Sequence, residues 1–233
     1  VSRVGRISLK CAGLYSDENE AAMKRVIDFC KTFGIAKQGV QIGHAGRKGS
    51  TLPPAQGGQP LKPEEGAWET LGPSPIPFGE GWHIPREMTK AELKQTKDDF
   101  VSAVKRAERI GYDLVEIHGG HGYLLNQFLS PLANQRKDEY GGSLENRMRL
   151  LLETVDRARA ALPKTLLIVR LSCTEYVPDG YSEHDIVALA QALQRAGVDA
   201  LDVSGGSNES PQLSKYCIQP PSFPRGMLAP YAK

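Results

Sequence analysis

The feature that most constrains the fold is a helix–strand unit that repeats four times along the chain. Each unit joins an amphipathic stretch of helical period to a short apolar run, and the four runs lie at residues 39–43, 113–117, 166–171 and 200–203. Because a helical stretch separates each run from the next, we expect parallel strands with helices covering the sheet. The pattern predicts an α/β fold.

The four amphipathic stretches carry recognisable helix boundaries. Ser16 opens the first stretch and Gly34 ends it. Thr89 opens the second as the first residue of a capping box. The third, 148–162, ends before a proline, and the fourth, 182–197, runs from a serine to a glycine. These signals predict four helices of ordinary length.

Each predicted strand ends in a polar or glycine-rich segment, and these segments include Gln41, residues 118–123, Arg170 and residues 204–207. A (β/α)8 barrel collects the carboxyl ends of its strands on one face, where active sites lie. A doubly wound open sheet is the alternative, but no Gly-x-Gly-x-x-Gly opens a helix after any of these strands. We therefore expect a TIM barrel of which this chain supplies about four βα units.

Two segments interrupt the helix–strand repeat. Residues 46–88 contain eight of the sixteen prolines and no periodic apolar pattern. A loop this long in a compact domain usually has a function, such as a lid or a substrate-binding excursion, and a variable insertion is the alternative. Residues 207–233 also lack periodicity, and the chain stops at Lys233 without another helix. We interpret that ending as a cut.

Charge and composition exclude several classes of protein. The net charge is +2 with acidic and basic residues interspersed, so nothing indicates nucleic acid or a charged membrane surface as partner. No apolar run approaches the roughly 18–20 residues of a membrane span, and the start lacks a signal-peptide pattern. The four cysteines are scattered without a CxxC pair, which disfavours a disulfide framework and an iron–sulfur or zinc cluster. We expect a cytoplasmic protein with reduced thiols.

The densest chemistry lies in Glu116-Ile-His-Gly-Gly-His-Gly-Tyr, at the end of the second apolar run. His118, His121 and Tyr123 fall within six residues, and the intervening glycines give the backbone freedom to bring them together. Such a site can bind an electron-rich oxygen and deliver a proton. The alternatives are a metal site formed by Glu116 and both histidines, or histidines paired with backbone in the core. Tyr123 could also simply pack on the rim.

Three longer motifs occur in a fixed order. They are Val40-Gln-Ile-Gly-His-Ala-Gly-Arg-Lys, Glu116-Ile-His-Gly-Gly-His-Gly-Tyr-Leu and Ser130-Pro-Leu-Ala-Asn-Gln-Arg-Lys-Asp-Glu-Tyr-Gly-Gly-Ser-Leu-Glu-Asn-Arg. They resemble the Old Yellow Enzyme family, and within it the bacterial thermophilic-like NADPH dehydrogenases, or ene-reductases. The resemblance runs from about Arg6 to the end of the chain. It implies that residues 1–233 form one partial FMN-binding TIM-barrel domain, with the family's third to sixth strands.

The resemblance also implies an activity. It is that of an FMN-dependent oxidoreductase, with NADPH or NADH as reductant, which reduces an activated C=C bond such as that of an enone. His118 and His121 would bind the substrate oxygen while hydride arrives from flavin N5, and Tyr123 would protonate the α-carbon. A phenol, with an ordinary pKa of about 10, is protonated at neutral pH, as a proton donor must be. No metal is implied.

Two further residues resemble the family's flavin contacts. Gln41 matches the amide that hydrogen-bonds the pyrimidine edge of FMN, since an amide can both donate and accept. Arg170 matches the arginine near flavin N1, where a cation stabilises the anionic reduced flavin. The structural alternative for Arg170 is an ion pair with Glu116. His44 and Arg47 face the same region, and we assign them no role.

The resemblance leaves several points open. The strands that precede these four in the family, and the loops that bind the FMN phosphate, have no counterpart here. A dienoyl-CoA-reductase-like flavoprotein with an iron–sulfur cluster is one alternative, and a catalytically inactive half-barrel fragment is another. We expect a homo-oligomer for the full-length protein. The segment after residue 130 is interpreted as structural, through Asn134, Arg136, Asp138, Tyr140 and Arg147.

Overall fold

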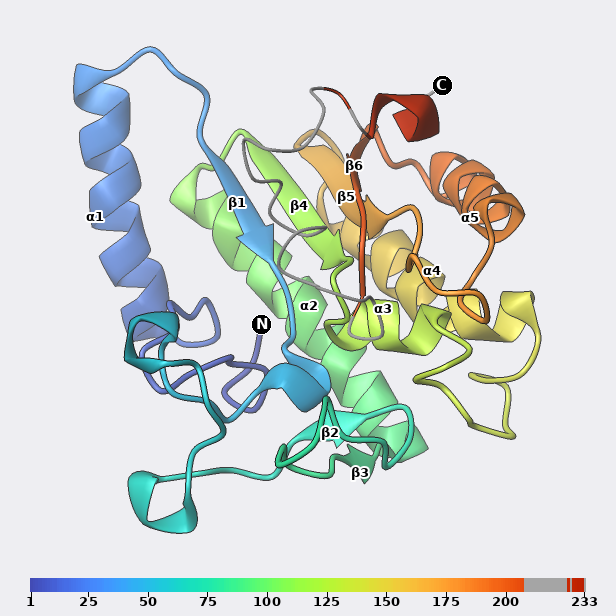
Figure 1. The fold of residues 1–233 in the computed structure, drawn as a ribbon. Helices are drawn as coiled ribbons and strands as arrows, with labels where there is room; N and C mark the ends of the chain where they lie inside the picture. Colours follow the sequence, from blue (N-terminus) through green and yellow to red (C-terminus); the bar gives the residue numbers. More distant parts are fainter. Residues whose placement is uncertain (208–225, 227, 233) are drawn as a thin grey trace.

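Four parallel strands form the central sheet of the computed structural model, which describes residues 1–207, 226 and 228–232 (Figure 1). They are β1 (Gly39–Ile42), β4 (Leu114–Gly119), β5 (Leu166–Ser172) and β6 (Ala200–Ser204). Their order across the sheet is β1–β4–β5–β6, the same as along the chain. This succession is that of consecutive βα units and confirms the predicted α/β class.

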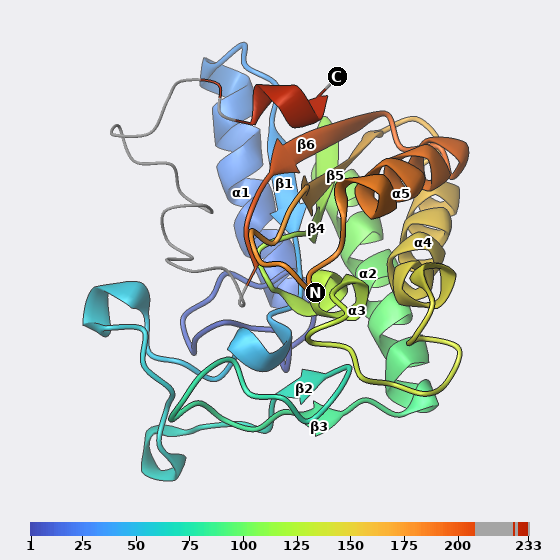
Figure 2. The same ribbon diagram turned by 45° about the vertical axis from the view of Figure 1, so that its right-hand side comes forward.

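Four long helices accompany these strands. They are α1 (Asp17–Phe33), α2 (Lys90–Ile110), α4 (Leu144–Ala161) and α5 (Glu183–Arg195). Helices α2, α4 and α5 lie on one side of the sheet, and each helix of the series contacts the next (Figure 2). The predicted N-caps Ser16, Thr89 and Ser182 each accept a backbone N–H of the first helical turn.

The two faces of the sheet differ in chemistry because side chains alternate along each strand. Val115 and Ile117 of β4 and Val169 of β5 are fully buried against the helix layer. The residues between them, Glu116, His118 and Arg170, lie on the opposite face. The sheet therefore has an apolar outer face and a polar inner face, as a barrel with a site inside it requires.

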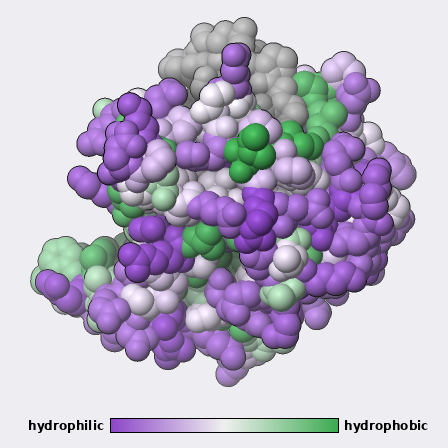
Figure 3. Space-filling view, turned by 90° about the horizontal axis from the view of Figure 1, so that it is seen from below, coloured by the Kyte–Doolittle hydropathy of each residue, from purple (hydrophilic) through white to green (hydrophobic). Residues whose placement is uncertain are grey.

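The excursion between β1 and α2 is more ordered than its sequence predicts. It contains three 3-10 turns, η1 (Gly46–Lys48), η2 (Pro54–Gln56) and η3 (Pro63–Glu65), and two paired two-residue strands, β2 (Leu71–Gly72) and β3 (Arg86–Glu87). It lies below the carboxyl ends of β1 and β4 in Figure 1. Seen from that side, the surface is mostly hydrophilic with scattered hydrophobic residues (Figure 3).

Two local predictions were wrong. The second strand was expected to end at residue 117, but His118 pairs with Arg170 and Gly119 with Leu171, so His118 lies within β4. At Gly119 the backbones of β4 and β5 approach each other closely, and the absence of a side chain allows it, since a Cβ on Gly119 would lie 3.1 Å from the Arg170 carbonyl oxygen. Helix α3 (Leu124–Leu129) was missed because all six of its residues are buried, which leaves no polar face to mark a period.

The described cysteines form no disulfide with one another. Cys11, Cys30 and Cys173 are free thiols, and Cys217 lies outside the described residues. Among the helices that the structure describes, none is both long and apolar enough to cross a membrane. Most of the aperiodic C-terminal segment also lies outside the described residues, apart from a short turn, η4 (Ala229–Ala232).

Candidate functional site

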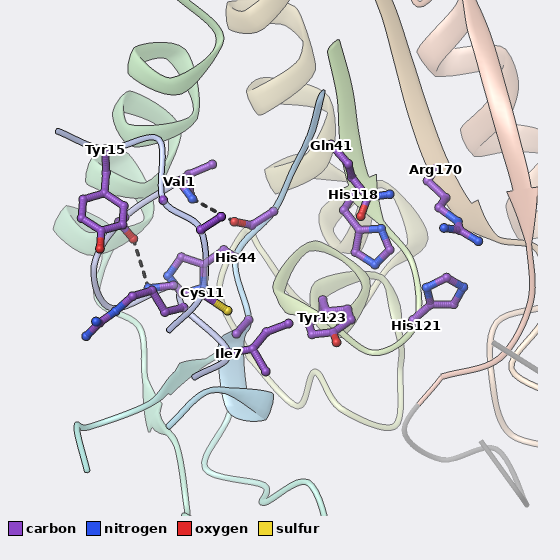
Figure 4. Close-up of a pocket in the computed structure, with 17 residues that line it drawn as sticks. Val1, Ile7, Cys11, Tyr15, Gln41, His44, His118, His121, Tyr123 and Arg170 are labelled. Carbon is purple, nitrogen blue, oxygen red and sulfur yellow. Dashed lines mark hydrogen bonds between the residues drawn. The ribbon is translucent and has the colours of Figure 1, made fainter. Parts of the chain in front are cut away.

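A pocket of about 280 Å³ lies at the inner face of the sheet, near the carboxyl ends of β1 and β4 (Figure 4). Its lining includes every site residue predicted from the sequence: Gln41, His118, His121, Tyr123 and Arg170. They come from three strands and the loop after β4. The structure therefore brings together side chains that are up to 129 positions apart in the sequence.

The His118 ring lies in the wall of the pocket, where it is largely buried. The side chain projects from β4 and is only 6% exposed. Among the described residues, neither Nδ1 nor Nε2 has a partner with hydrogen-bond geometry, although the nearby Gly120 backbone slightly raises the pKa of the ring. The ring centroid lies 5.1 Å from that of His121 and 5.2 Å from that of Tyr123. Because buried polar atoms are normally satisfied, this ring is suited to a ligand in the pocket.

His121 adopts a backbone conformation that few residues other than glycine favour. Its φ is +57°, in the left-handed region, which costs energy for a residue with a Cβ. Two serines hold it there. The backbone N–H of His121 donates to Ser172 Oγ at 2.9 Å, and its ring Nε2 lies 2.6 Å from Ser204 Oγ. The strained turn thereby places the second imidazole beside the first.

Both imidazoles are neutral at neutral pH. Burial, followed by the charges of His121, Arg170 and Lys48, lowers the pKa of His118 to about 3. Burial, followed by Arg170 and Lys48, lowers the pKa of His121 to about 4. A neutral imidazole carries one N–H donor and one acceptor nitrogen. The pair can therefore offer two N–H donors to a single acceptor atom.

Tyr123 is fixed by the start of helix α3, of which it is the N-cap residue. The next residue, Leu124, donates its backbone N–H to the His44 carbonyl oxygen at 3.0 Å. The Lys48 ammonium lies 4.3 Å from the centre of the Tyr123 ring and donates to the His121 carbonyl oxygen at 2.9 Å. The local sequence pattern does not mark Lys48 as a site residue, although it is the last residue of the first motif.

Gln41 contacts Glu116, and Arg170 contacts Asp202. The Gln41 amide nitrogen donates to Glu116 Oε1. Arg170 Nε lies 3.2 Å from Asp202 Oδ2, an ion pair without hydrogen-bond geometry. The suggested pairing of Arg170 with Glu116 is therefore wrong, because the register of the sheet places Asp202 directly beside Arg170. Burial raises the pKa of Glu116.

His44 and Arg47, to which no role was assigned, have different surroundings. His44 lines the pocket and accepts the Gly46 N–H on Nδ1 at 3.0 Å, and its Nε2 has no hydrogen-bond partner within the described residues. Burial lowers its pKa to about 3. Arg47 instead binds the excursion, donating to the carbonyl oxygens of Ile76 and Pro77 at 3.2 and 3.3 Å. Within the described part of the chain, no three His, Cys, Asp or Glu side chains are placed to bind one metal ion.

The segment after Ser130 makes the contacts of a structural loop. Arg136 forms a bidentate pair with Asp138, at 2.9 and 2.6 Å. The Asn134 amide donates to two backbone carbonyl oxygens, one of them that of Tyr140, at 2.8 and 2.7 Å. Arg147 binds two more carbonyl oxygens. These contacts confirm the structural interpretation of the third motif.

Comparisons with known proteins agree with this geometry. The "NADPH dehydrogenase" of Geobacillus sp. (strain WCH70) is 42% identical over 207 residues, which are 89% of this chain and 56% of that protein. The solved structure of a 2-naphthoyl-CoA reductase complex matches with a TM-score of 0.75 at 28% identity, covering 89% of this chain and 32% of the other. The Old Yellow Enzyme from Pichia sp. matches with a TM-score of 0.65 at 29% identity, covering 82% of this chain and 52% of the other.

These matches confirm the resemblance and the barrel fold. The four βα units form part of a (β/α)8 barrel, and the chain spans about half the length of the curated relatives. The sequence signature described as "NADH:flavin oxidoreductase / NADH oxidase family" matches residues 1–209. The chain therefore belongs to the NADH:flavin oxidoreductase / NADH oxidase family.

Proposed function

We propose that the protein containing this segment is an FMN-dependent NAD(P)H oxidoreductase that reduces activated C=C bonds. The observation that carries the proposal is a pair of buried, neutral imidazoles beside a tyrosine, where His118 has no hydrogen-bond partner on either ring nitrogen among the described residues. Such a pair is suited to an acceptor oxygen that gains negative charge during the reaction.

The inner face of the sheet fits the edge of a flavin ring. The pyrimidine edge of FMN alternates N–H donors with carbonyl acceptors, which an amide and a cation can match. Gln41 is exposed on this face, and its amide nitrogen is engaged by Glu116, which leaves the amide oxygen to accept an N–H. Arg170, on β5 across the intervening strand β4, is partly exposed. We assign Gln41 and Arg170 to the ring and no described residue to the phosphate.

The two histidines would bind and polarise the substrate. FMN, when bound, supplies the hydride that NAD(P)H has delivered to it. His118 and His121 each donate an N–H to the carbonyl oxygen conjugated with the C=C bond. Negative charge builds on that oxygen as the β-carbon is reduced, so the hydrogen bonds strengthen in the transition state. Loss of one such donor typically costs about 10²–10³ in rate.

Tyr123 would supply the proton that completes the reduction. Hydride addition to the β-carbon leaves the substrate as an enolate, and the phenolic O–H gives its proton to the α-carbon. The π electrons of the enolate form the new C–H bond, and an oxygen lone pair re-forms the C=O bond, which leaves the oxygen neutral. The nascent phenolate lies next to Lys48, whose ammonium is 4.3 Å from the ring centre and stabilises the negative charge. The proton returns to Tyr123 from solvent before the next turnover.

A CoA thioester is the second candidate substrate, because one solved neighbour is a 2-naphthoyl-CoA reductase complex. A conjugated thioester carbonyl would accept the same two N–H donors. Enzymes of the dienoyl-CoA-reductase type also carry an iron–sulfur cluster, so iron and acid-labile sulfide analysis of the purified protein distinguishes the two candidates. Iron-free protein with full activity on an enone favours the first.

The test is an anaerobic titration of the FMN-loaded protein. NADPH should bleach the yellow flavin, and a cyclic enone should restore the colour with formation of the saturated ketone. An isolated alkene without a conjugated carbonyl is the matched control and should leave the flavin reduced. Bleaching by NADPH that no activated alkene reverses would contradict the proposed substrate class.

A further inference from the structure

Ser204 contacts two of the residues that line the pocket, His121 and Arg170. It is the last residue of β6 and is only 2% exposed. Its Oγ lies 2.6 Å from Nε2 of His121 and 3.4 Å from Nη2 of Arg170. Among the residues that the structure describes, its hydroxyl has no other hydrogen-bond partner than these two side chains.

The chemistry of the two partners decides which way the Ser204 hydroxyl points. A guanidinium has five N–H donors and no acceptor, so Arg170 can only donate to Ser204 Oγ. Among the described residues, the hydroxyl proton then has a single acceptor within reach, which is Nε2 of His121. Leaving a buried O–H without an acceptor would forfeit a hydrogen bond, so donation to His121 is favoured.

An imidazole that accepts on one nitrogen carries its proton on the other. His121 is neutral, because burial and the nearby cations lower its pKa to about 4. With Nε2 occupied as an acceptor, the single proton must be on Nδ1. Nδ1 makes no hydrogen bond in the described part of the chain, and the ring lines the pocket (Figure 4).

We propose that Ser204 is a positioning residue that fixes His121 in the Nδ1–H tautomer, so that the pocket receives a donor instead of a lone pair. The role of that donor in binding a carbonyl oxygen rests on the proposed function. The tautomer itself does not rest on the proposed function, since Ser204, His121 and Arg170 determine it without any bound ligand. A neutral histidine in water favours the opposite tautomer, with the proton on Nε2, so the assignment makes a distinct prediction.

Long-range proton–nitrogen correlation spectra of the chain labelled with ¹⁵N-histidine measure the tautomer directly. The His121 signals are assigned by their loss in His121→Gln. In the wild-type chain His121 should be predominantly Nδ1–H. In Ser204→Ala the tautomer ratio should shift toward Nε2–H by about fivefold or more, the change expected for one lost hydrogen bond. Ser204→Thr keeps the hydroxyl and should keep the wild-type pattern.

Ser172→Ala is the matched control, because the Ser172 hydroxyl binds the backbone N–H of the same histidine and not its ring. It should leave the tautomer unchanged. An Nε2–H tautomer in the wild-type chain, an unaltered ratio in Ser204→Ala, or an equal shift in Ser172→Ala would each overturn the proposal. The spectra require neither FMN nor substrate. A protein that fails to reduce alkenes but shows the Nδ1–H tautomer would thus contradict the proposed function alone.

Discussion

Burial is the dominant influence on the three histidines at the pocket. It lowers the pKa of His44 and His118 to about 3 and that of His121 to about 4, against an ordinary value of 6.5. The nearby cations Arg170 and Lys48 act in the same direction on His118 and His121. The site is thus built to keep imidazoles neutral, which suits hydrogen-bond donors to a substrate and not charged partners of an anion.

This burial predicts a pH-dependent stability. Between about pH 6.5 and pH 3 these histidines are protonated in the unfolded chain but remain neutral in the folded chain. The free energy of unfolding therefore falls as the pH is lowered through this window. His118→Gln should flatten that fall, because it removes one of the contributing groups. Chemical denaturation at several pH values measures the slope, with His184→Gln, an exposed histidine of α5, as control. Equal slopes for His118→Gln and the wild-type chain would contradict the neutral burial of His118.

At the scale of elements, the loop before α4 is anchored by one buried cation. The Arg136 side chain is 4% exposed, pairs with Asp138 and donates to the Met88 carbonyl oxygen at 2.8 Å. It therefore ties the end of the excursion to the loop that leads into α4.

Arg136→Ala should lower the free energy of unfolding by about 3 kcal/mol, because it leaves Asp138 and a buried carbonyl oxygen without their partner. Arg25→Ala, at an exposed position on α1, should change it by less than about 0.5 kcal/mol. Urea denaturation measures both values. A loss for Arg136→Ala no larger than that of the control would show that the loop does not depend on this cation.

The sequence predicts elements whose pattern is local, and it fails where contacts between distant segments decide. The four strands and long helices follow from apolar period and capping residues, and the five candidate site residues follow from motif resemblance. Helix α3 has no polar face, and the extension of β4 depends on pairing with β5, so neither is visible in the local pattern. The pairing of Arg170 with Asp202 depends on strand register, which the sequence alone does not specify.

At the scale of the whole molecule, the sheet has two edges. In the described part of the chain, β1 pairs only with β4 and β6 only with β5. Four hydrophobic side chains are also strongly exposed on or just after α1: Val26, Phe29, Phe33 and Ile35. Unpaired strand edges and apolar surface of this kind favour association with another copy or a complementary segment.

We expect the 233-residue chain to self-associate at micromolar concentration for this reason. Light scattering over a dilution series measures it, and the average mass should rise with concentration. Phe29→Glu should weaken the association by placing a charge in the apolar α1 surface. Lys24→Gln on the same helix lowers the net charge by the same one unit outside that surface and serves as the control. A monodisperse monomer at every concentration would show that both edges are protected by some other packing.

The central claim is that the histidine pair acts on the substrate, and stopped-flow measurement of the two half-reactions tests it most directly. The FMN-loaded protein, its His118→Ala and His121→Ala variants, and the control His184→Ala are each reduced with NADPH and then mixed anaerobically with a cyclic enone. We predict that flavin reduction stays within about threefold of the wild-type rate. Reoxidation by the enone should fall by about 10²–10³ in each pocket variant and not in the control. Unchanged reoxidation in both pocket variants would contradict the account.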